Sequence, residues 1–300
     1  MDEVIRMDNL QNHPVLNSFY IEFMHPSPDG NKILYNDTSS RIDFPELAAI
    51  WVMDSDGANL HSLLTAPQDL SWYPTAAIWS PDGQQIAYLK IFQNEADEIT
   101  NRELWIMDKN GQNSFKVFAH KTVLNPYFNH VFYWALNGYI YIVNAEYSLY
   151  AIDPQHGNIY RLGDDVDSLA LRMALSPTGE VIIDAQNTVS TSRLSSFVKV
   201  MTDGEAVCWS LDGNFLLFKV ESSLFLQDAR TGQIQPIAFQ NLNNAQILSL
   251  SPDNHYLLYE SEGDIFILDI LSLGDSSMPL IQSNLGQPSS IYFIGWLPIP

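Results

Sequence analysis

The chain has 300 residues, of which 46% are hydrophobic and 16% are charged, and its formal net charge at pH 7 is −21. These values indicate a globular protein with enough apolar residues for a large core. Clustered Lys and Arg hold nucleic acids and anionic membranes, so an acidic chain with only 14 such residues predicts neither as a partner. Without an apolar run of about 18 residues or a visible secretory leader, we expect a cytoplasmic protein. A chain trimmed of a leader or anchor would look the same.

Turns related to Ser-Pro-Asp-Gly occur six times, each between two apolar segments. Proline presets φ at the second turn position, aspartate suits the third, and glycine takes the positive φ that closes the turn. Each copy therefore predicts a β-hairpin. The copies occupy residues 27–30, 80–83, 135–138, 176–179, 210–213 and 251–254.

A second motif, apolar-aromatic-x-apolar-Asp, follows the hairpin in five of the six repeats. In the fourth repeat, Phe197–Met201 keeps the strand pattern but lacks the aspartate. One repeat thus predicts four strands, which is the unit of a β-propeller blade. A tryptophan just before a turn predicts a ring packed between adjacent blades; these residues are Trp79, Trp134, Trp209 and Trp296.

The chain resembles the TolB-type six-bladed β-propellers, and Ser80–Gly111 carries the likeness most fully, with SPDGQQIAYLK followed by ELWIMDKNG. The resemblance extends over about residues 17–300. It implies an all-β fold of six blades, each of four antiparallel strands, in a single domain over residues 1–300. Propellers host many unrelated functions, so the resemblance implies no particular activity. The α/β domains that accompany the propellers of TolB and of prolyl oligopeptidase-like enzymes are not recognised in this sequence, so the partners of the TolB family are not carried over.

A leftover strand at each end of the chain suggests how the ring closes. Residues 291–298 read as one more first strand, and residues 4–7 read as a short strand within the segment 1–16. We expect the two ends to pair in one blade, because an open ring would expose sheet edges. A seventh, composite blade is the alternative.

Catalytic and metal-binding motifs do not stand out. The single cysteine, Cys208, lies in a strand and forms no intrachain disulfide, and the seven histidines are scattered. Asp54–Asn59 has the alternating oxygen ligands of a calcium loop, but Lys109 at the equivalent place of the second repeat favours an ordinary turn. We predict no catalytic residues, no metal and no cofactor.

The first two repeats are longer than the others, and the extra residues carry the candidate binding site. They lie at 38–47 and 93–102, with long connections at 66–73 and 120–129. In an antiparallel blade these loops emerge at the same end, and insertions in repeat proteins are often binding surfaces. We predict a site for a protein partner with a basic surface, formed by the aromatic residues Phe44, Trp72, Tyr73, Phe92 and Tyr127 and the acidic residues Asp43, Asp97 and Glu98.

Two functions of different classes follow. The first is a non-enzymatic interaction platform that scaffolds, masks or regulates a partner protein. The alternative is an enzyme, or a propeller that binds a carbohydrate or another small ligand in its central channel. First-strand segments such as 77–79 and 206–208 are apolar, whereas a catalytic channel needs converging polar groups, so the platform is favoured.

Overall fold

The computed structural model describes strands and turns over much of the chain. The described residues are 21–37, 48–94, 96, 98–120, 132–144, 148–164, 175–179, 181–183, 198–200, 205–237, 245–251, 253–261, 264–270 and 278–281. The chain divides into two compact units, residues 1–169 with 297–300 and residues 170–296. Each unit is described by itself.

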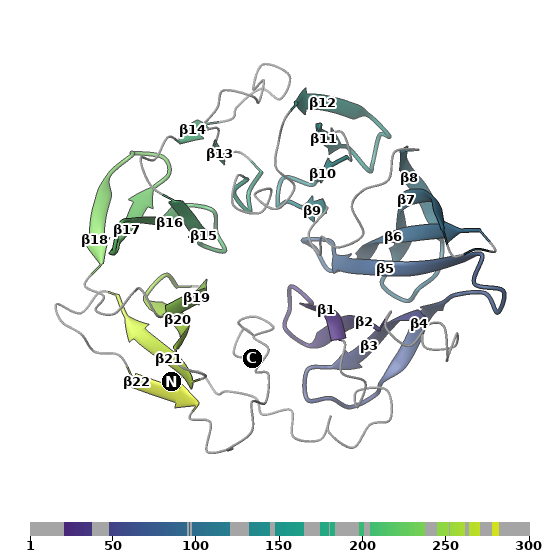
Figure 1. The fold of residues 1–300 in the computed structure, drawn as a ribbon, viewed down its shortest axis with the longest axis horizontal. Helices are drawn as coiled ribbons and strands as arrows, with labels where there is room; N and C mark the ends of the chain where they lie inside the picture. The colour runs from purple at the N-terminus through teal and green to yellow at the C-terminus, as the bar shows by residue number, and fades with distance from the viewer. Residues whose placement is uncertain are drawn as a thin grey trace. The chain divides into compact units, whose positions relative to one another are not determined.

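The first unit contains three four-stranded antiparallel sheets whose strands follow one another in chain order, side by side (Figure 1). One is formed by β1 (Ile21–Pro26), β2 (Lys32–Asp37), β3 (Ala49–Asp54) and β4 (His61–Thr65). The next is formed by β5 (Trp72–Trp79), β6 (Gln85–Gln93), β7 (Ile99–Asp108) and β8 (Phe115–His120). The third is formed by β9 (Phe132–Trp134), β10 (Ile140–Val143), β11 (Leu149–Ile152) and β12 (Ile159–Gly163).

The second unit contains two further sheets of this kind and one smaller sheet. One is formed by β15 (Glu205–Trp209), β16 (Phe215–Val220), β17 (Ser223–Asp228) and β18 (Ile234–Ile237). The other is formed by β19 (Ala245–Leu250), β20 (Tyr256–Ser261), β21 (Asp264–Asp269) and β22 (Met278–Ile281). The smaller sheet pairs β13 (Val181–Ile183) with β14 (Val198–Val200) in parallel.

The expected blade is confirmed, because five repeats form four-stranded antiparallel sheets. Six blades were expected, and the described residues show five. The fourth repeat departs from the pattern, since its strands β13 and β14 run parallel and a parallel pair cannot be joined by a tight hairpin. The segments 1–16 and 291–298 lie outside the described residues, so ring closure and a composite seventh blade remain predictions.

The Ser-Pro-Asp-Gly turns share one hydrogen-bond network, which the turn between β5 and β6 illustrates. Ser80 Oγ donates to Asp82 Oδ1 at 2.6 Å and accepts from the N–H of Gln85 at 2.9 Å. Gly83, at φ +66°, donates its N–H to the Ser80 carbonyl at 2.9 Å. The predicted hairpin is therefore confirmed in atomic detail. The same serine and aspartate contacts recur in the turns at 27–32, 210–215 and 251–256.

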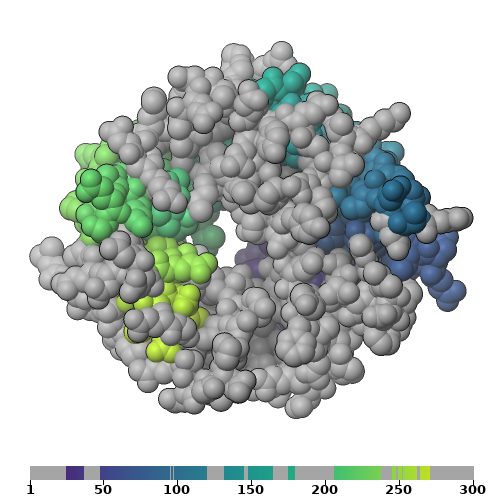
Figure 2. All heavy atoms as spheres, in the orientation of Figure 1, coloured from purple at the N-terminus to yellow at the C-terminus, as the bar shows by residue number. Residues whose placement is uncertain are grey.

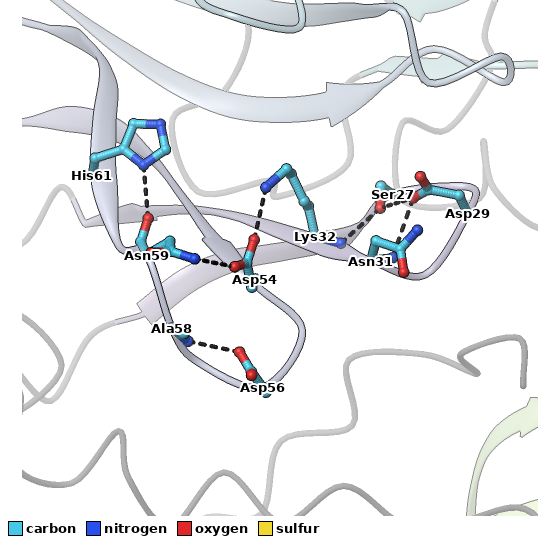
Figure 3. A network of polar contacts seen from close by, with 9 residues as sticks. All are labelled: Ser27, Asp29, Asn31, Lys32, Asp54, Asp56, Ala58, Asn59 and His61. Atoms are coloured by element: carbon cyan, nitrogen blue, oxygen red, sulfur yellow. Dashed lines mark hydrogen bonds and ion pairs between the residues drawn. The ribbon is translucent and has the colours of Figure 1, made fainter. Parts of the chain in front are cut away.

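The aspartate that ends the third strand of a blade caps the turn toward the fourth strand. Figure 3 shows Asp54 accepting from Lys32 Nζ at 2.7 Å and from Asn59 Nδ2. The hydrogen bond from Lys32 is the largest cause that lowers the pKa of Asp54. The motif aspartate is thus a structural residue of the turn. Backbone N–H groups of the turn bind the equivalent carboxylates of Asp108, Asp153 and Asp228.

Buried tryptophans join neighbouring blades of the first unit, as expected. Trp79 is 5% exposed and packs with residues of the β1–β4 blade. Trp134 is 7% exposed and belongs to a cluster that also contains residues of β5–β8. In the second unit, Trp209 is buried among residues of its own blade. Trp296 lies outside the described residues.

A buried amide also connects the first two blades. Asn36 of β2 is fully buried, donates through Nδ2 to the Ala49 carbonyl at 3.2 Å and accepts through Oδ1 from the Ala77 N–H at 3.1 Å. Ala77 lies beside Ala76, a non-glycine residue at φ +53°, in a bulge that shifts the β5–β6 register. The amide therefore binds backbone groups from both blades.

Candidate functional site

The β5–β8 blade has the longest described strands. Strands β5, β6 and β7 have 8, 9 and 10 residues, whereas the strands of the other described sheets have three to six. The extra residues of the second repeat, expected at 93–102 as a loop, belong largely to this hairpin. Pairing continues to Phe92 opposite Asn101 and Gln93 opposite Ile99, so the insertion lengthens the sheet. Part of this blade is visible in blue in Figure 2.

The turn between β6 and β7 is closed by Asn94. Its Oδ1 accepts the N–H groups of Ala96 at 3.0 Å and Glu98 at 2.9 Å. Its Nδ2 donates to Glu98 Oε2 at 3.0 Å, and its N–H donates to the Glu98 carbonyl at 3.0 Å. Such side-chain bonds to the backbone stabilise a tight reversal. They hold the end of the long hairpin together.

One side of this long sheet brings aromatic rings around a lysine. The register places Trp72 opposite Phe92, and Lys90 opposite Pro74 and Glu103. Lys90 Nζ lies 4.0 Å from the centroid of the Trp72 ring and 3.9 Å from that of the Trp105 ring. Both distances are well within the range of favourable cation–π contacts. The half-buried ammonium group is therefore held between two indoles.

A buried carboxylate balances the charge on the same side. Glu103 is 7% exposed and accepts from Trp105 Nε1 at 2.9 Å and from Lys116 Nζ at 3.0 Å. Partial burial lowers the pKa of Lys90, and the charge of Glu103 acts in the opposite direction. We refer to Trp72, Lys90, Phe92, Glu103, Trp105 and Lys116 as the Lys90 cluster.

The structure brings two of the predicted binding residues together and separates a third from them. Trp72 and Phe92 are cross-strand neighbours, both half-buried. Tyr73 follows Trp72 in an extended strand, is 6% exposed and belongs to the core cluster that extends toward β9–β12. Glu98 is exposed in the hairpin turn. The remaining predicted residues, Asp43, Phe44, Asp97 and Tyr127, lie outside the described residues.

Sequence reasoning missed Lys90, Glu103 and Trp105. Trp105 was recognised only as the aromatic position of a repeat motif, and Lys90 and Glu103 read as ordinary polar residues of strands. The spacing in the sequence could have indicated part of the cluster, because residues two apart in a strand point to the same face. Lys90 and Phe92 therefore share one face of β6, and Glu103 and Trp105 share one face of β7. Which residues of β6 lie opposite which residues of β7 depends on the pairing register of the two strands.

Metal-binding groups and reactive thiols are two other kinds of functional group that a site among the described residues could use. These residues contain no group of three or more His, Cys, Asp or Glu residues arranged to hold a metal ion. Burial raises the pKa of the Cys208 thiol to about 12, so the reactive thiolate is scarce at neutral pH. Within the same residues, no helix is long and apolar enough to cross a membrane.

No family model matches the chain, and no curated protein matches it. Among solved structures, it is similar to dipeptidyl peptidase 4 of Porphyromonas gingivalis, with 12% identity over 88% of this chain and 45% of that one, at a TM-score of 0.50. The fold is a β-propeller. The chain is also similar to the β-propeller domain of Myceliophteria thermophila Cps50 (Swd1), with 14% identity over 89% of each chain and a TM-score of 0.48. A further similar structure is the putative TolB of Agrobacterium tumefaciens, with 13% identity over 87% of this chain and 80% of that one, at a TM-score of 0.39. At such identities the likeness concerns the fold alone.

Proposed function

We propose that this propeller is a non-enzymatic platform that binds a protein partner, and that the Lys90 cluster is the centre of the binding surface. The observation that carries the proposal is the pair of indoles on either side of Lys90, on a blade in which β5, β6 and β7 are longer than the strands of the other described sheets. Large aromatic residues at the centre of an interface tend to supply most of the binding energy.

The cluster is suited to binding because its side chains are already ordered. Cation–π contacts hold Trp72 and Trp105, and Glu103 receives hydrogen bonds from Trp105 and Lys116. An ordered surface loses less conformational entropy on association than a mobile one. The half-buried rings of Trp72, Phe92 and Trp105 still have accessible area for a partner.

The charge of the chain supports a partner with a basic surface. The net charge of −21 gives long-range attraction for such a protein, while the Lys90 cluster itself carries charges of both signs. Charges at the rim of an interface mainly steer encounter, whereas central rings hold the complex. We therefore expect the association rate to fall as ionic strength rises.

The test is a pull-down of the partner with the double variant Trp72→Ala, Phe92→Ala. Truncation of a central aromatic residue costs on the order of 2 kcal/mol of binding free energy, so the double variant should lose the partner. The matched control is Phe115→Ala, because Phe115 is a 42% exposed aromatic residue at the other end of the same blade. Loss of the partner by Phe115→Ala with retention by the double variant would place the binding surface elsewhere.

We further propose that the whole chain is one cytoplasmic domain in which the repeat containing β13 and β14 supplies a sixth blade. The recurrence of the turn at 176–179, where Gly179 has φ +71° and donates to the Ser176 carbonyl, supports this proposal. Calorimetry tests it: a single cooperative unfolding transition is expected, and two separate transitions would contradict a single domain.

A further inference from the structure

A buried arginine lies on the side of the β5–β8 sheet opposite the Lys90 cluster. Arg102 in β7 is 5% exposed, and its backbone pairs with Ile91 of β6 and with His120 of β8. Successive residues of a strand point to opposite faces, so Arg102 and its neighbour Glu103 face opposite sides. Arg102 therefore takes no part in the charge balance around Glu103.

Two neighbours of Arg102 on its own side are buried apolar residues. Ile91, its partner in β6, is 4% exposed, and Leu104, two residues along β7, is 1% exposed. Both belong to the core cluster that also contains Tyr73 and Phe118. Arg102 is thus a buried charged residue beside residues of a hydrophobic core.

The Nε atom of Arg102 is buried and has no hydrogen-bond acceptor among the residues that the structure describes. Burial lowers the pKa of the Arg102 guanidinium, and the nearby Tyr73 acts in the opposite direction. Arginine nevertheless stays protonated at neutral pH, because its ordinary pKa lies far above neutral pH. A buried charge without a counter-ion is unfavourable, whereas a buried pair with good hydrogen bonds is tolerated.

We propose that Arg102 is the anchor of a carboxylate-binding site on this side of the blade. The planar guanidinium presents paired N–H donors that match the two oxygens of a carboxylate. Such a ligand supplies both the negative charge and the acceptors that Arg102 needs, and the low dielectric beside the core residues Ile91 and Leu104 strengthens the interaction. The carboxylate belongs either to a small organic acid or to an acidic side chain of a peptide.

This proposal goes beyond the interaction platform, because the two sites lie on opposite sides of one sheet. A ligand at Arg102 needs neither Trp72 nor Phe92. Failure of one proposal therefore leaves the other intact.

The experiment compares thermal unfolding of the full chain in sodium acetate and in sodium chloride at equal ionic strength and pH 7. Screening of the acidic chain is then the same in both salts. Acetate should raise the melting temperature of the wild type by a few degrees more than chloride, because a ligand that binds only the folded state stabilises it. Equal melting temperatures in the two salts would overturn the proposal.

Arg102→Leu provides the matched variant, and Lys109→Leu, on an exposed residue of the same blade, is the control. The acetate increment should vanish in Arg102→Leu and persist in Lys109→Leu. Persistence of the increment in Arg102→Leu would overturn the proposal. If Arg102→Leu fails to fold, the NMR signal of Arg102 Nε–H in the wild type decides instead. The signal is expected to shift when acetate is titrated, and a signal that stays unchanged would overturn the proposal.

A capped pentaglutamate peptide distinguishes the two sources of the carboxylate. An acidic segment of a protein is indicated if the peptide shifts the Arg102 signal at lower carboxylate concentration than acetate does. A small organic acid is indicated if only acetate does so. A wild-type signal that responds to neither probe would contradict a carboxylate site.

Discussion

The β5–β8 blade carries Lys90, Arg102, Lys109 and Lys116, whereas the β19–β22 blade lies in a stretch from residue 231 to residue 300 without lysine or arginine. In both blades the same serine–aspartate turn joins the first strand to the second. Their strands differ in length, since β6 and β7 have 9 and 10 residues while β20 and β21 have six each. The comparison shows that the turn chemistry specifies a blade and leaves the composition of its surface free.

The registers of the two hairpins show where the blades diverge. Tyr259 pairs with Phe266 in β20 and β21, and the two rings stack at 5.2 Å. Two residues further, Ser261 pairs with Asp264 and the β20–β21 pairing ends. In the β5–β8 blade, Tyr88 pairs with Trp105, and the next pair on that side is Lys90 with Glu103. The pairing then continues to Phe92 and Gln93, so the extra length adds Phe92, and Trp72 opposite it, to the Lys90–Glu103 pair.

The largest effect is expected at Gly111, in the turn between β7 and β8. A Cβ atom there would lie 2.5 Å from the Leu63 carbonyl oxygen of β4, and the residue has φ +81°. Gly111→Ala should reduce the free energy of unfolding by more than about 2 kcal/mol, from steric conflict and backbone strain together. Gly232→Ala is the control, since a Cβ at Gly232, at φ +72°, meets no atom within 4 Å. If chemical denaturation gave equal losses of unfolding free energy for Gly111→Ala and Gly232→Ala, the two blades would not be in close contact at Gly111.

Asn36 is expected to have the next largest effect. Asn36→Ala removes the partners of the Ala49 carbonyl and the Ala77 N–H in a fully buried place. Each buried polar group left unsatisfied costs about 1–3 kcal/mol, so we expect a loss of about 2 kcal/mol in denaturant unfolding. A loss below about 0.5 kcal/mol, which is typical of surface changes, would show that the amide does not join the blades.

Ser80→Ala and Ser251→Ala test whether the serine–aspartate turn contributes the same stability in the two compared blades. Each serine is buried and both donates to an aspartate and accepts a backbone N–H. Each variant should lose about 1–2 kcal/mol of stability. Losses that differ by more than about 1 kcal/mol, a substantial fraction of the stability of a domain, would contradict the equivalence of the turns.

Lys90→Met tests the feature that distinguishes the long blade. The change keeps the alkyl chain and removes the ammonium group from between Trp72 and Trp105. We expect a loss of about 1 kcal/mol, the usual size of a partly desolvated cation–π contact. Lys219→Met in β16 is the control, because Lys219 is also half-buried in the second strand of a blade. An effect no larger than that of the control would contradict the stabilising contact.

The smallest effect concerns pH. The pKa values of Asp82 and Asp253 are lowered, and the hydrogen bond from Ser80 or Ser251 is the largest cause in each case. A carboxyl group with a depressed folded-state pKa stabilises the fold above its unfolded-state pKa of about 3.9 and loses this contribution as the pH falls through the folded value.

Carboxyl chemical shifts followed by NMR should therefore titrate below the ordinary range at both aspartates. In Ser80→Ala, the pKa of Asp82 should rise toward its ordinary value while that of Asp253 stays low. A pKa of Asp82 that is unaffected by Ser80→Ala would show that the serine is not the main cause.

Much of the blade could be predicted because its signals are local. The turn at 80–83 specifies a hairpin through the φ preferences of three residues, and the short apolar runs on either side are typical of buried strands. Trp79 could be assigned to a place between blades because a large ring at a repeated strand position has few other environments. The expected loop at 93–102 was wrong for a physical reason: its residues are mainly polar, and only pairing with β6 makes them a strand.

The sequence by itself determined the four-stranded unit, the position of its turns and the acidic character of the chain, because these depend on residue type and on contacts a few residues apart. Only the tertiary structure decided that Lys90 lies between Trp72 and Trp105, that Glu103 balances this charge and that Arg102 is buried on the other side. These relations depend on the register of three strands, and the bulge between Thr75 and Ile78 shifts that register. A shift of one residue moves a side chain to the opposite face of a sheet, so local patterns could not specify the site.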